Sequence, residues 1–404
     1  MTDNRGPLTG MKVIELAHVM AGPTCGRMLA DMGADVIKVE RVPDGDDTRR
    51  FLPPDIAGES AAYMMMNRNK RGVAIDLKNA EGKEVLLRML ADADVVIENY
   101  RADTMAKLGL GYDDLKVDNP GLIYCAISGF GRTGPYAPRG GYDLIAQGMS
   151  GLMSITGEAP GREPVKVGAP VTDITAGILG ALGVVSAYTH KLQTGEGQMV
   201  DTSLFEAGIT HTYWQSAIAL ATGFAPGPMG SRHPLNTPYQ AFKCADGWIN
   251  LGASNTRLWG RLLEITNLQE LSDDPRFSDS AARMANIDAL IDTLNIVFET
   301  KPMTHWLAEL ERVGIPAGPV MDVNQMHADP HTEAREMVVE VDHTTAGPVK
   351  TIGLPIKFSK TPGVIDGGAP IYGQHTRLVL AEYGYNNEEI ENLIGAGAVI
   401  ANQT

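Results

Sequence analysis

The first half of the chain alternates short apolar runs with segments of helical periodicity, and this alternation constrains the fold more than any other feature. A helical pattern at Pro23–Met32 follows the first run, and another from Ala80 to Leu90 follows the third. The apolar runs are Met11–Leu16, Asp35–Glu40, Gly72–Leu77, Asp94–Glu98, Leu122–Ser128 and Met199–Thr202. Continuous apolar strands between helices predict a parallel sheet covered on both faces. We therefore expect a Rossmann-like α/β domain.

The second half predicts a smaller α+β domain. A long apolar helix over Thr175–Leu192 is expected to be buried or at a subunit interface, and another helix runs to about Ala221. The segment 222–240 is rich in Pro and Gly and predicts a linker. Residues 241–252 predict a hairpin, and 287–300 and 304–313 predict helices. The expected division is a large domain over 1–221, a linker over 222–240, a small domain over 241–320 and a mixed segment over 321–404.

Composition excludes several classes of function. A chain of 404 residues suggests two domains, and a net charge of −15 argues against a nucleic-acid partner. Cys25, Cys125 and Cys244 form no CxxC pair, and the nine histidines offer no metal set. The longest apolar stretch is shorter than the roughly 20 residues that cross a bilayer. With a polar N-terminus, these features predict a cytoplasmic protein that binds neither a metal nor a membrane.

Gly129–Gly134 matches the GxGxxG pattern after a predicted strand. Dinucleotide binding requires a helix to open at that point, so that its N-terminus faces the pyrophosphate. Pro135 and Pro138 follow instead, so we expect a mobile glycine-rich loop rather than a nicotinamide or flavin site.

Asp173 precedes the long apolar helix and has two compatible interpretations. An Asp before such a helix is a typical N-cap. A carboxylate kept ionised by a helix N-terminus can also attack a thioester carbonyl without a general base. Basic residues near predicted strand ends would suit a phosphorylated cofactor if they cluster; they are Lys38, Arg41, Lys70, Arg71, Lys78, Arg101, Lys107 and Arg139.

Thirteen segments, in order over almost the whole chain, resemble the family III CoA-transferases, the group that includes formyl-CoA and carnitine CoA-transferases. They include VIELAHVMAG at Val13–Gly22, GADVIKVER at Gly33–Arg41, GYDLIAQ at Gly141–Gln147, GAPVTDITAG at Gly168–Gly177 and GIPAGPV at Gly314–Val320. Each segment is weak alone, and together they are specific.

The resemblance implies ring-shaped subunits interlocked as a homodimer, with 321–404 completing the large domain. It implies that Asp173 is the nucleophile and that CoA and acyl-CoA are substrates, with no tightly bound cofactor. The positions matching the family's CoA contacts are His18, Val19, Met20, Ala21, Arg41, Ile75, Lys78, Asn99, Tyr100, Lys107 and Arg139. Met20 stands where the formyl-CoA enzymes carry Gln, and Ser128 where they carry Lys.

Two alternatives remain. The α-methylacyl-CoA racemases share the resemblance but use a His at the position of Tyr142, and a non-catalytic CoA-binding protein would need Asp173 only as a cap. For the substrates, we expect a succinyl-CoA donor and a C4–C6 dicarboxylate acceptor. The carboxylate of such a dicarboxylic acid that lies farther from the reacting group would be held by one or two of four basic side chains, Arg232, His233, Lys243 and Arg257.

Overall fold

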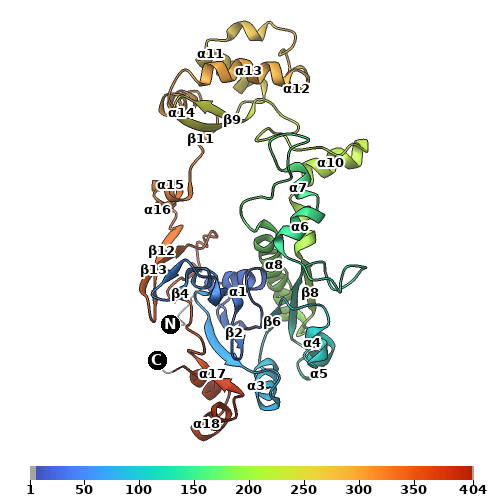
Figure 1. Ribbon diagram of the computed structural model, residues 1–404, viewed down its shortest axis with the longest axis vertical. Coiled ribbons are helices and arrows are strands. Elements are labelled where there is room, and N and C mark those ends of the chain that lie inside the picture. The colour runs from blue at the N-terminus through green and yellow to red at the C-terminus, as the bar shows by residue number, and fades with distance from the viewer. Residues whose placement is uncertain (1–5, 403–404) are drawn as a thin grey trace. The chain divides into compact units, whose positions relative to one another are not determined.

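The computed structural model describes residues 6–402, and the chain divides into two compact units (Figure 1). The first unit contains residues 6–151, 167–211 and 330–402, and the second contains 152–166 and 212–329. The expected boundaries at 221, 240 and 320 are therefore not those of the compact units. The linker segment belongs to the second unit, where Pro228 packs against Gly157.

A seven-stranded sheet forms the centre of the first unit, in the order β14-β5-β2-β1-β6-β7-β8. Six strands are parallel, and the short β14 pairs antiparallel with β5. Counting the parallel strands along the chain gives the order 3-2-1-4-5-6 of a Rossmann fold. The strands are β1 (Lys12–Glu15), β2 (Asp35–Arg41), β5 (Arg71–Ile75), β6 (Val95–Glu98), β7 (Ile123–Ser128), β8 (Met199–Ser203) and β14 (Val399–Ile400).

Helices cover both faces of this sheet, as the continuous apolar runs predict. Neighbouring residues on a strand point to opposite faces, so Val13 packs in one core cluster and Ile14 in the other. The first cluster includes residues of α1 (Ala21–Asp31), α8 (Val171–Thr194) and α9 (Leu204–Thr210). The second includes residues of α3 (Ala80–Ala91), α5 (Tyr112–Asp118), α17 (Thr376–Glu382) and α18 (Asn387–Gly395).

Shorter elements complete the first unit. They are η1 (Asp47–Arg50), β3 (Asp55–Ile56), β4 (Glu59–Ser60), α2 (Ala61–Asn67), α4 (Thr104–Lys107), α6 (Asp143–Met149), α16 (Pro330–Ala334), β12 (Val338–His343) and β13 (Gly347–Ile352). The β12–β13 hairpin packs on α2 through Tyr63, Val341 and Val349.

Helix α8 is long and apolar enough, by length and composition alone, to cross a membrane. In the first unit it packs on its neighbours through small residues. A Cβ built at Gly177 would lie 2.5 Å from Ala21 O, and one at Gly183 would lie 2.5 Å from Val200 Cγ1. The opposite face exposes Ile178, Leu182 and Leu192. The helix is therefore buried on one face only, not all round.

The second unit is a three-stranded antiparallel sheet with helices, and the predicted hairpin is confirmed. Strands β9 (Tyr239–Cys244) and β10 (Gly247–Gly252) pair with each other, and β11 (Ala317–Pro319) pairs with β10. Phe242, Trp259, Phe298 and Trp306 lie in its core. The helices are α7 (Leu152–Ile155), α10 (Tyr213–Thr222), α11 (Thr256–Thr266), η2 (Gln269–Ser272), α12 (Ser280–Ala285), α13 (Ile287–Phe298), α14 (Met303–Arg312) and α15 (Val323–His327).

Candidate active site

The strand order creates a crevice in the first unit where the chain reverses direction. Strands β1 and β6 are neighbours, but the strands that follow them in the chain lie on opposite sides. The turns after β1 and β6 must therefore diverge at the carboxyl ends of the strands. Ligands of open α/β sheets bind at such a switch point.

A cavity of about 300 Å³ occupies this position. Its walls come from the turns after β1, β6 and β7, from η1, and from the first turn of α8. The lining residues are His18, Val19, Met20, Ala21, Asp47, Asn99, Tyr100, Arg101, Ala102, Ile127, Ser128, Gly129, Ala137, Arg139, Gly140, Gly141, Tyr142, Asp173 and Leu204. Pockets that bind small ligands have volumes of about 300–1,000 Å³, so this cavity lies at the lower end of that range.

The turn after β1 is held by hydrogen bonds on its inner side. Lys38 Nζ donates to Ala17 O at 2.8 Å, and the Val19 amide donates to both carboxylate oxygens of Asp46 at 3.2 and 3.4 Å. Val19 has a φ of 67°, an unfavourable value for a β-branched residue. The surrounding structure must compensate for that strain. The turn therefore lines the cavity as a backbone segment held by hydrogen bonds to Lys38 and Asp46.

The supporting charges lie beneath this turn and are removed from solvent. Lys38 pairs with Asp46 at 2.9 Å and with Glu15 at 3.1 Å, and Lys70 pairs with Glu15 at 2.7 Å. The neighbouring Lys38 holds the pKa of Asp46 well below its usual range, despite burial. Burial is the main cause that lowers the pKa of Lys70 to about 8. Lys38 and Lys70 are thus buried in ion pairs beneath the turn, so they do not belong to a basic cluster that could face a phosphate.

Asp173 is the third residue of α8. The helix begins at Val171 with Pro170 at the N-cap position, so the prediction that Asp173 is the N-cap is wrong. Burial, with a smaller contribution from the charge of Asp143, raises the pKa of Asp173 to about 7. Burial therefore acts against the ionisation that a helix N-terminus favours.

The structure brings eight of the predicted site residues together and leaves four outside. Those lining the cavity are His18, Val19, Met20, Ala21, Asn99, Tyr100, Arg139 and Asp173. Ile75 is fully buried in the core of the sheet, so its side chain cannot contact a ligand. Arg41 pairs with Asp47, Lys107 pairs with Asp103, and Lys78 is exposed; none of the three lines the cavity.

The glycine-rich loop after β7 opens no helix, as predicted. Helix α6 begins only at Asp143, after the two prolines. A Cβ built at Gly129 would lie 2.6 Å from the Gly141 Cα, so neither end of the loop can carry a side chain without moving. Arg139 stacks on the Tyr136 ring at 4.1 Å from its centroid, within the same loop. The loop thus brings a cation to the cavity wall.

Comparison with known proteins decides the family. The family model described as CoA-transferase family III matches residues 8–376, nearly the whole chain. This protein belongs to CoA-transferase family III.

The CoA-transferase is similar to proteins named as CoA-transferases over nearly its full length. It is 41% identical over 391 residues to the succinate–glutarate CoA-transferase of Agrobacterium fabrum, and the matched region covers 95% of this chain and 97% of that protein. It is 38% identical over 397 residues to the succinyl-CoA:mesaconate CoA-transferase of Haloarcula hispanica, with coverage of 94% and 97%. The crystal structure of a CAIB/BAIF family protein from Brucella suis has a TM-score of 0.83 and 41% identity, and covers 94% of this chain and 100% of that chain.

Asp47, Gly140 and Asp143 are residues of this CoA-transferase's site that the sequence patterns did not predict. Asp143 accepts hydrogen bonds from the Thr172 amide at 2.9 Å and from Thr172 Oγ1 at 2.7 Å. The sequence did contain a signal for Asp143, because Asp143 and Thr172 lie in two of the segments that carry the family resemblance. Their contact spans 29 positions and is not visible from spacing.

The four basic residues proposed for a distal carboxylate lie in the second unit. Arg232 pairs with Asp288 at 2.6 Å, and Lys243 lies 3.6 Å from Glu299. The His233 ring packs edge-on to Trp214 and Tyr239. Arg257 is exposed in the first turn of α11. Arg232 and Lys243 line one cavity of about 690 Å³ within this unit, together with Trp248.

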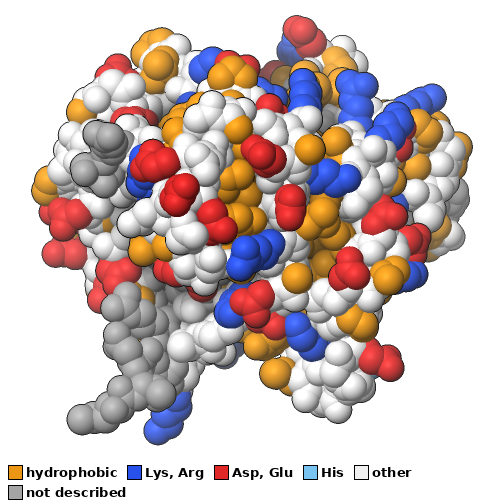
Figure 2. Space-filling view, turned by 90° about the horizontal axis from the view of Figure 1, so that it is seen from below, with side chains coloured by type: hydrophobic (Ala, Val, Ile, Leu, Met, Phe, Trp, Pro, Cys, Tyr) orange, Lys and Arg blue, Asp and Glu red, His pale blue; other side chains and the backbone are white. Residues whose placement is uncertain are grey.

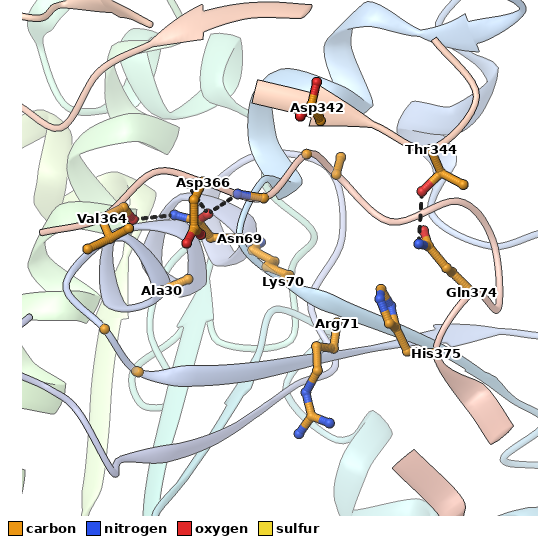
Figure 3. A pocket seen from close by; sticks show the side chains of 15 residues that line it. Ala30, Asn69, Lys70, Arg71, Asp342, Thr344, Val364, Asp366, Gln374 and His375 are labelled. Atoms are coloured by element: carbon orange, nitrogen blue, oxygen red, sulfur yellow. Dashed lines mark hydrogen bonds between the residues drawn. The ribbon is translucent and has the colours of Figure 1, made fainter. Parts of the chain in front are cut away.

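Another hollow of the first unit, of about 370 Å³, lies near the amino end of β5 (Figure 3). Its most basic side chain, Arg71, is already paired with Asp35 and Glu382, each at 2.6 Å. The His375 ring accepts a hydrogen bond from the Gly72 amide at 3.0 Å through Nδ1. The face of the molecule seen in Figure 2 mixes acidic and basic side chains. Because Arg71 and His375 already have partners within the chain, the cavity that contains Asp173 is the better candidate for the active site.

Proposed function

We propose that this CoA-transferase moves CoA from succinyl-CoA to a C4–C6 dicarboxylate through covalent intermediates on Asp173. The observation that carries the proposal is the position of Asp173, which lines the switch-point cavity together with residues 18–21. The curated relatives named for succinate–glutarate and succinyl-CoA:mesaconate transfer support both the donor and the acceptor class.

The chemistry needs a carboxylate and no metal or redox group. An Asp173 oxygen attacks the thioester carbonyl, the C–S bond breaks, and an aspartyl–succinyl anhydride and CoA thiolate result. The thiolate then attacks the aspartyl carbonyl, which releases succinate and leaves an aspartyl–CoA thioester. The acceptor carboxylate attacks that thioester, and the returning thiolate takes the acceptor acyl group and regenerates Asp173. Each step exchanges one acyl bond for another, so no co-reactant is required.

The cavity supplies several groups for a CoA thioester in this proposal. Arg101 and Arg139 would pair with phosphates, and the neighbouring Tyr100 and His18 rings, 4.8 Å apart, would bound the pantetheine arm. Met20 and Ser128 line the same cavity at the positions that differ from the formyl-CoA enzymes. Formyl transfer is therefore not proposed.

We further propose that the protein acts as a cytoplasmic homodimer of interlocked, ring-shaped subunits, without a tightly bound cofactor. Exposed apolar side chains on α8 and α10, among them Leu182, Trp214 and Leu220, support an oligomeric partner. Arg232, His233, Lys243 and Arg257 are the proposed ligands of a distal carboxylate. An acceptor KM that is unchanged in both Arg232→Ala and Arg257→Ala would remove the support for that assignment.

The test is a transfer assay with an isotopic label. The protein is mixed with succinyl-CoA and pooled carboxylic acids, new thioesters are identified by mass spectrometry, and the active acceptor is then supplied with ¹⁸O in its carboxylate. The mechanism passes one ¹⁸O to Asp173 and, in later turnovers, to the released succinate. Asp173→Ala should form no product.

The other outcomes separate the alternatives. Transfer without label in succinate, or transfer that survives in Asp173→Ala, would contradict the covalent role of Asp173. Racemisation of an enantiopure 2-methylacyl-CoA without transfer would point to the racemase chemistry. Binding of CoA without either reaction would point to a non-catalytic CoA-binding protein.

A further inference from the structure

Two segments that resemble the family are joined by side-chain hydrogen bonds just before Asp173. The Asp143 carboxylate, in the first turn of α6, takes the Thr172 amide and hydroxyl on one oxygen and Gln147 Nε2 on the other, the last at 2.7 Å. Gln147 Oε1 in turn accepts from the Val167 amide at 2.9 Å. Helix α6 therefore holds the chain from Val167 to Thr172, which leads into Asp173.

These bonds also occupy the beginning of α8. Thr172 is the second residue of the helix, and its amide is one of the groups that the helix itself cannot satisfy. Asp143, from another helix, takes the place of a cap, because Pro170 at the N-cap position provides no side-chain hydrogen bond. The negatively charged carboxylate of Asp143 is thus bonded to Thr172, which directly precedes the residue that we propose as the nucleophile.

We propose that Asp143 is a positioning residue for Asp173: it fixes the first turn of α8 through Thr172 and places a second negative charge beside the reacting carboxylate. This inference rests on the proposed function and goes beyond it. When Asp173 forms an anhydride or a thioester it loses its own charge. The repulsion from Asp143 and the cost of burying a carboxylate then disappear together, so both favour the covalent intermediates over free enzyme.

Other charged and titratable groups line the cavity or lie on elements that pack against α8. Those lining the cavity are His18, Asp47, Tyr100, Arg101, Arg139 and Tyr142. His211, after α9, bonds Thr175 at 2.8 Å, and Glu206 on α9 bonds Ser203 at 2.7 Å. Asp201 on β8 accepts from the Arg132 amide at 2.8 Å. Asp143 is the neighbour whose charge raises the pKa of Asp173.

The experiment measures the ionisation of Asp173 directly, so that it does not depend on transfer activity. Difference infrared spectroscopy follows the protonated carboxylic acid against pH in the parent protein, with Asp173→Asn used to identify the Asp173 signal. The parent should titrate near pH 7. Asp143→Asn keeps a side-chain oxygen for Thr172, removes the charge and loses the bond from Gln147 Nε2; it should lower the midpoint by on the order of one pH unit.

Thr172→Val is the matched control. It removes the hydroxyl bond, keeps the amide bond and leaves the charge of Asp143 in place. Its titration midpoint should equal that of the parent. An unchanged midpoint in Asp143→Asn, or an equal fall in Thr172→Val, would overturn the electrostatic role.

A second measurement tests the covalent intermediate. At equilibrium with succinyl-CoA, intact-mass analysis gives the fraction of subunits that carry CoA less one water. Asp143→Asn should lower this fraction severalfold, and Thr172→Val should change it less. An equal or larger fraction in Asp143→Asn would contradict the proposal. If the parent carries no adduct and forms no product, the proposed function itself fails, while the infrared result still decides the coupling of the two carboxylates.

Discussion

The side chain of Asn99 forms two hydrogen bonds with the backbone of His18: its Oδ1 accepts from the His18 amide at 3.0 Å, and its Nδ2 donates to the His18 carbonyl at 2.7 Å. The turn after β6 thereby fixes the turn after β1 across the switch point. Both residues line the cavity, so the pair determines its width at this edge.

Replacing Asn99 should therefore affect binding as well as stability. Asn99→Ala leaves both backbone groups of His18 without these partners and should cost about 1–3 kcal/mol of unfolding free energy. CoA affinity, measured by calorimetry, should fall roughly tenfold or more, since 1.4 kcal/mol corresponds to a factor of ten. Asn79→Ala is the control, because Asn79 caps α3 and does not line the cavity. Equal CoA affinity in both variants would contradict the assignment.

The buried charges under Val19 predict a larger loss of stability. Asp46→Asn removes one partner of a fully buried ion pair with Lys38 and should destabilise the protein by about 3–5 kcal/mol in urea unfolding. The pKa of Asp46 is depressed in the folded state, so its contribution is complete above the unfolded pKa of roughly 4 and is lost as pH falls below it. The difference between variant and parent should therefore shrink in acid. A constant difference down to pH 2–3 would disagree with this account.

Asp173 predicts the opposite dependence on pH. Its folded pKa is raised to about 7, above the unfolded value near 4, so the folded protein binds the extra proton between these limits. The presence of Asp173 therefore favours the folded state less and less as pH rises from about 4 to 7. Asp173→Asn should raise the melting temperature by a few degrees at pH 8 and have little effect at pH 4–5. A stabilisation that is the same at every pH would show that the carboxylate charge is not its cause.

The same pKa predicts the acidic side of the activity profile. Only the ionised form of Asp173 attacks a thioester, so kcat/KM should rise with pH and level off above about 7. The profile is measured with succinyl-CoA and one acceptor over pH 5–9. An acidic midpoint near 4 would mean that the carboxylate titrates like an exposed one.

Two glycines in helices provide a matched pair for the packing of α8. Gly177→Ala places a methyl group 2.5 Å from both Ala21 O and Thr24 Cβ, and should cost about 1–3 kcal/mol. It should also lower transfer activity, because α8 carries Asp173 and α1 follows the turn 18–20. At Gly260 on α11, such a methyl group would have no heavy atom within 4 Å apart from the adjoining backbone of its own helix, so Gly260→Ala should stabilise by about 0.5–1 kcal/mol. Stabilisation by both substitutions would show that α1 moves away at no cost.

Periodicity along the chain was enough to predict the six parallel strands of the first unit and three of its helices, α1, α3 and α8. A strand that is covered on both faces must carry apolar side chains on both sides. It therefore appears in the sequence as a continuous apolar run, such as Asp35–Glu40. The absence of a helix after Gly134 also followed from local chemistry, because the prolines prevent one. The family and Asp173 as its candidate nucleophile came from the ordered set of short segments rather than from any one of them.

Tertiary structure alone decided what each charged residue does. Lys38, Lys70 and Arg139 look equivalent in the sequence, yet two are buried in ion pairs and the third lines the cavity. Likewise the start of α8 at Val171, the burial of Ile75 and the bond from Asp143 to Thr172 depend on which elements pack together. Desolvation and charge–charge interactions act through space, so the ionisation of Asp173 is a property of the folded unit and not of its sequence neighbours.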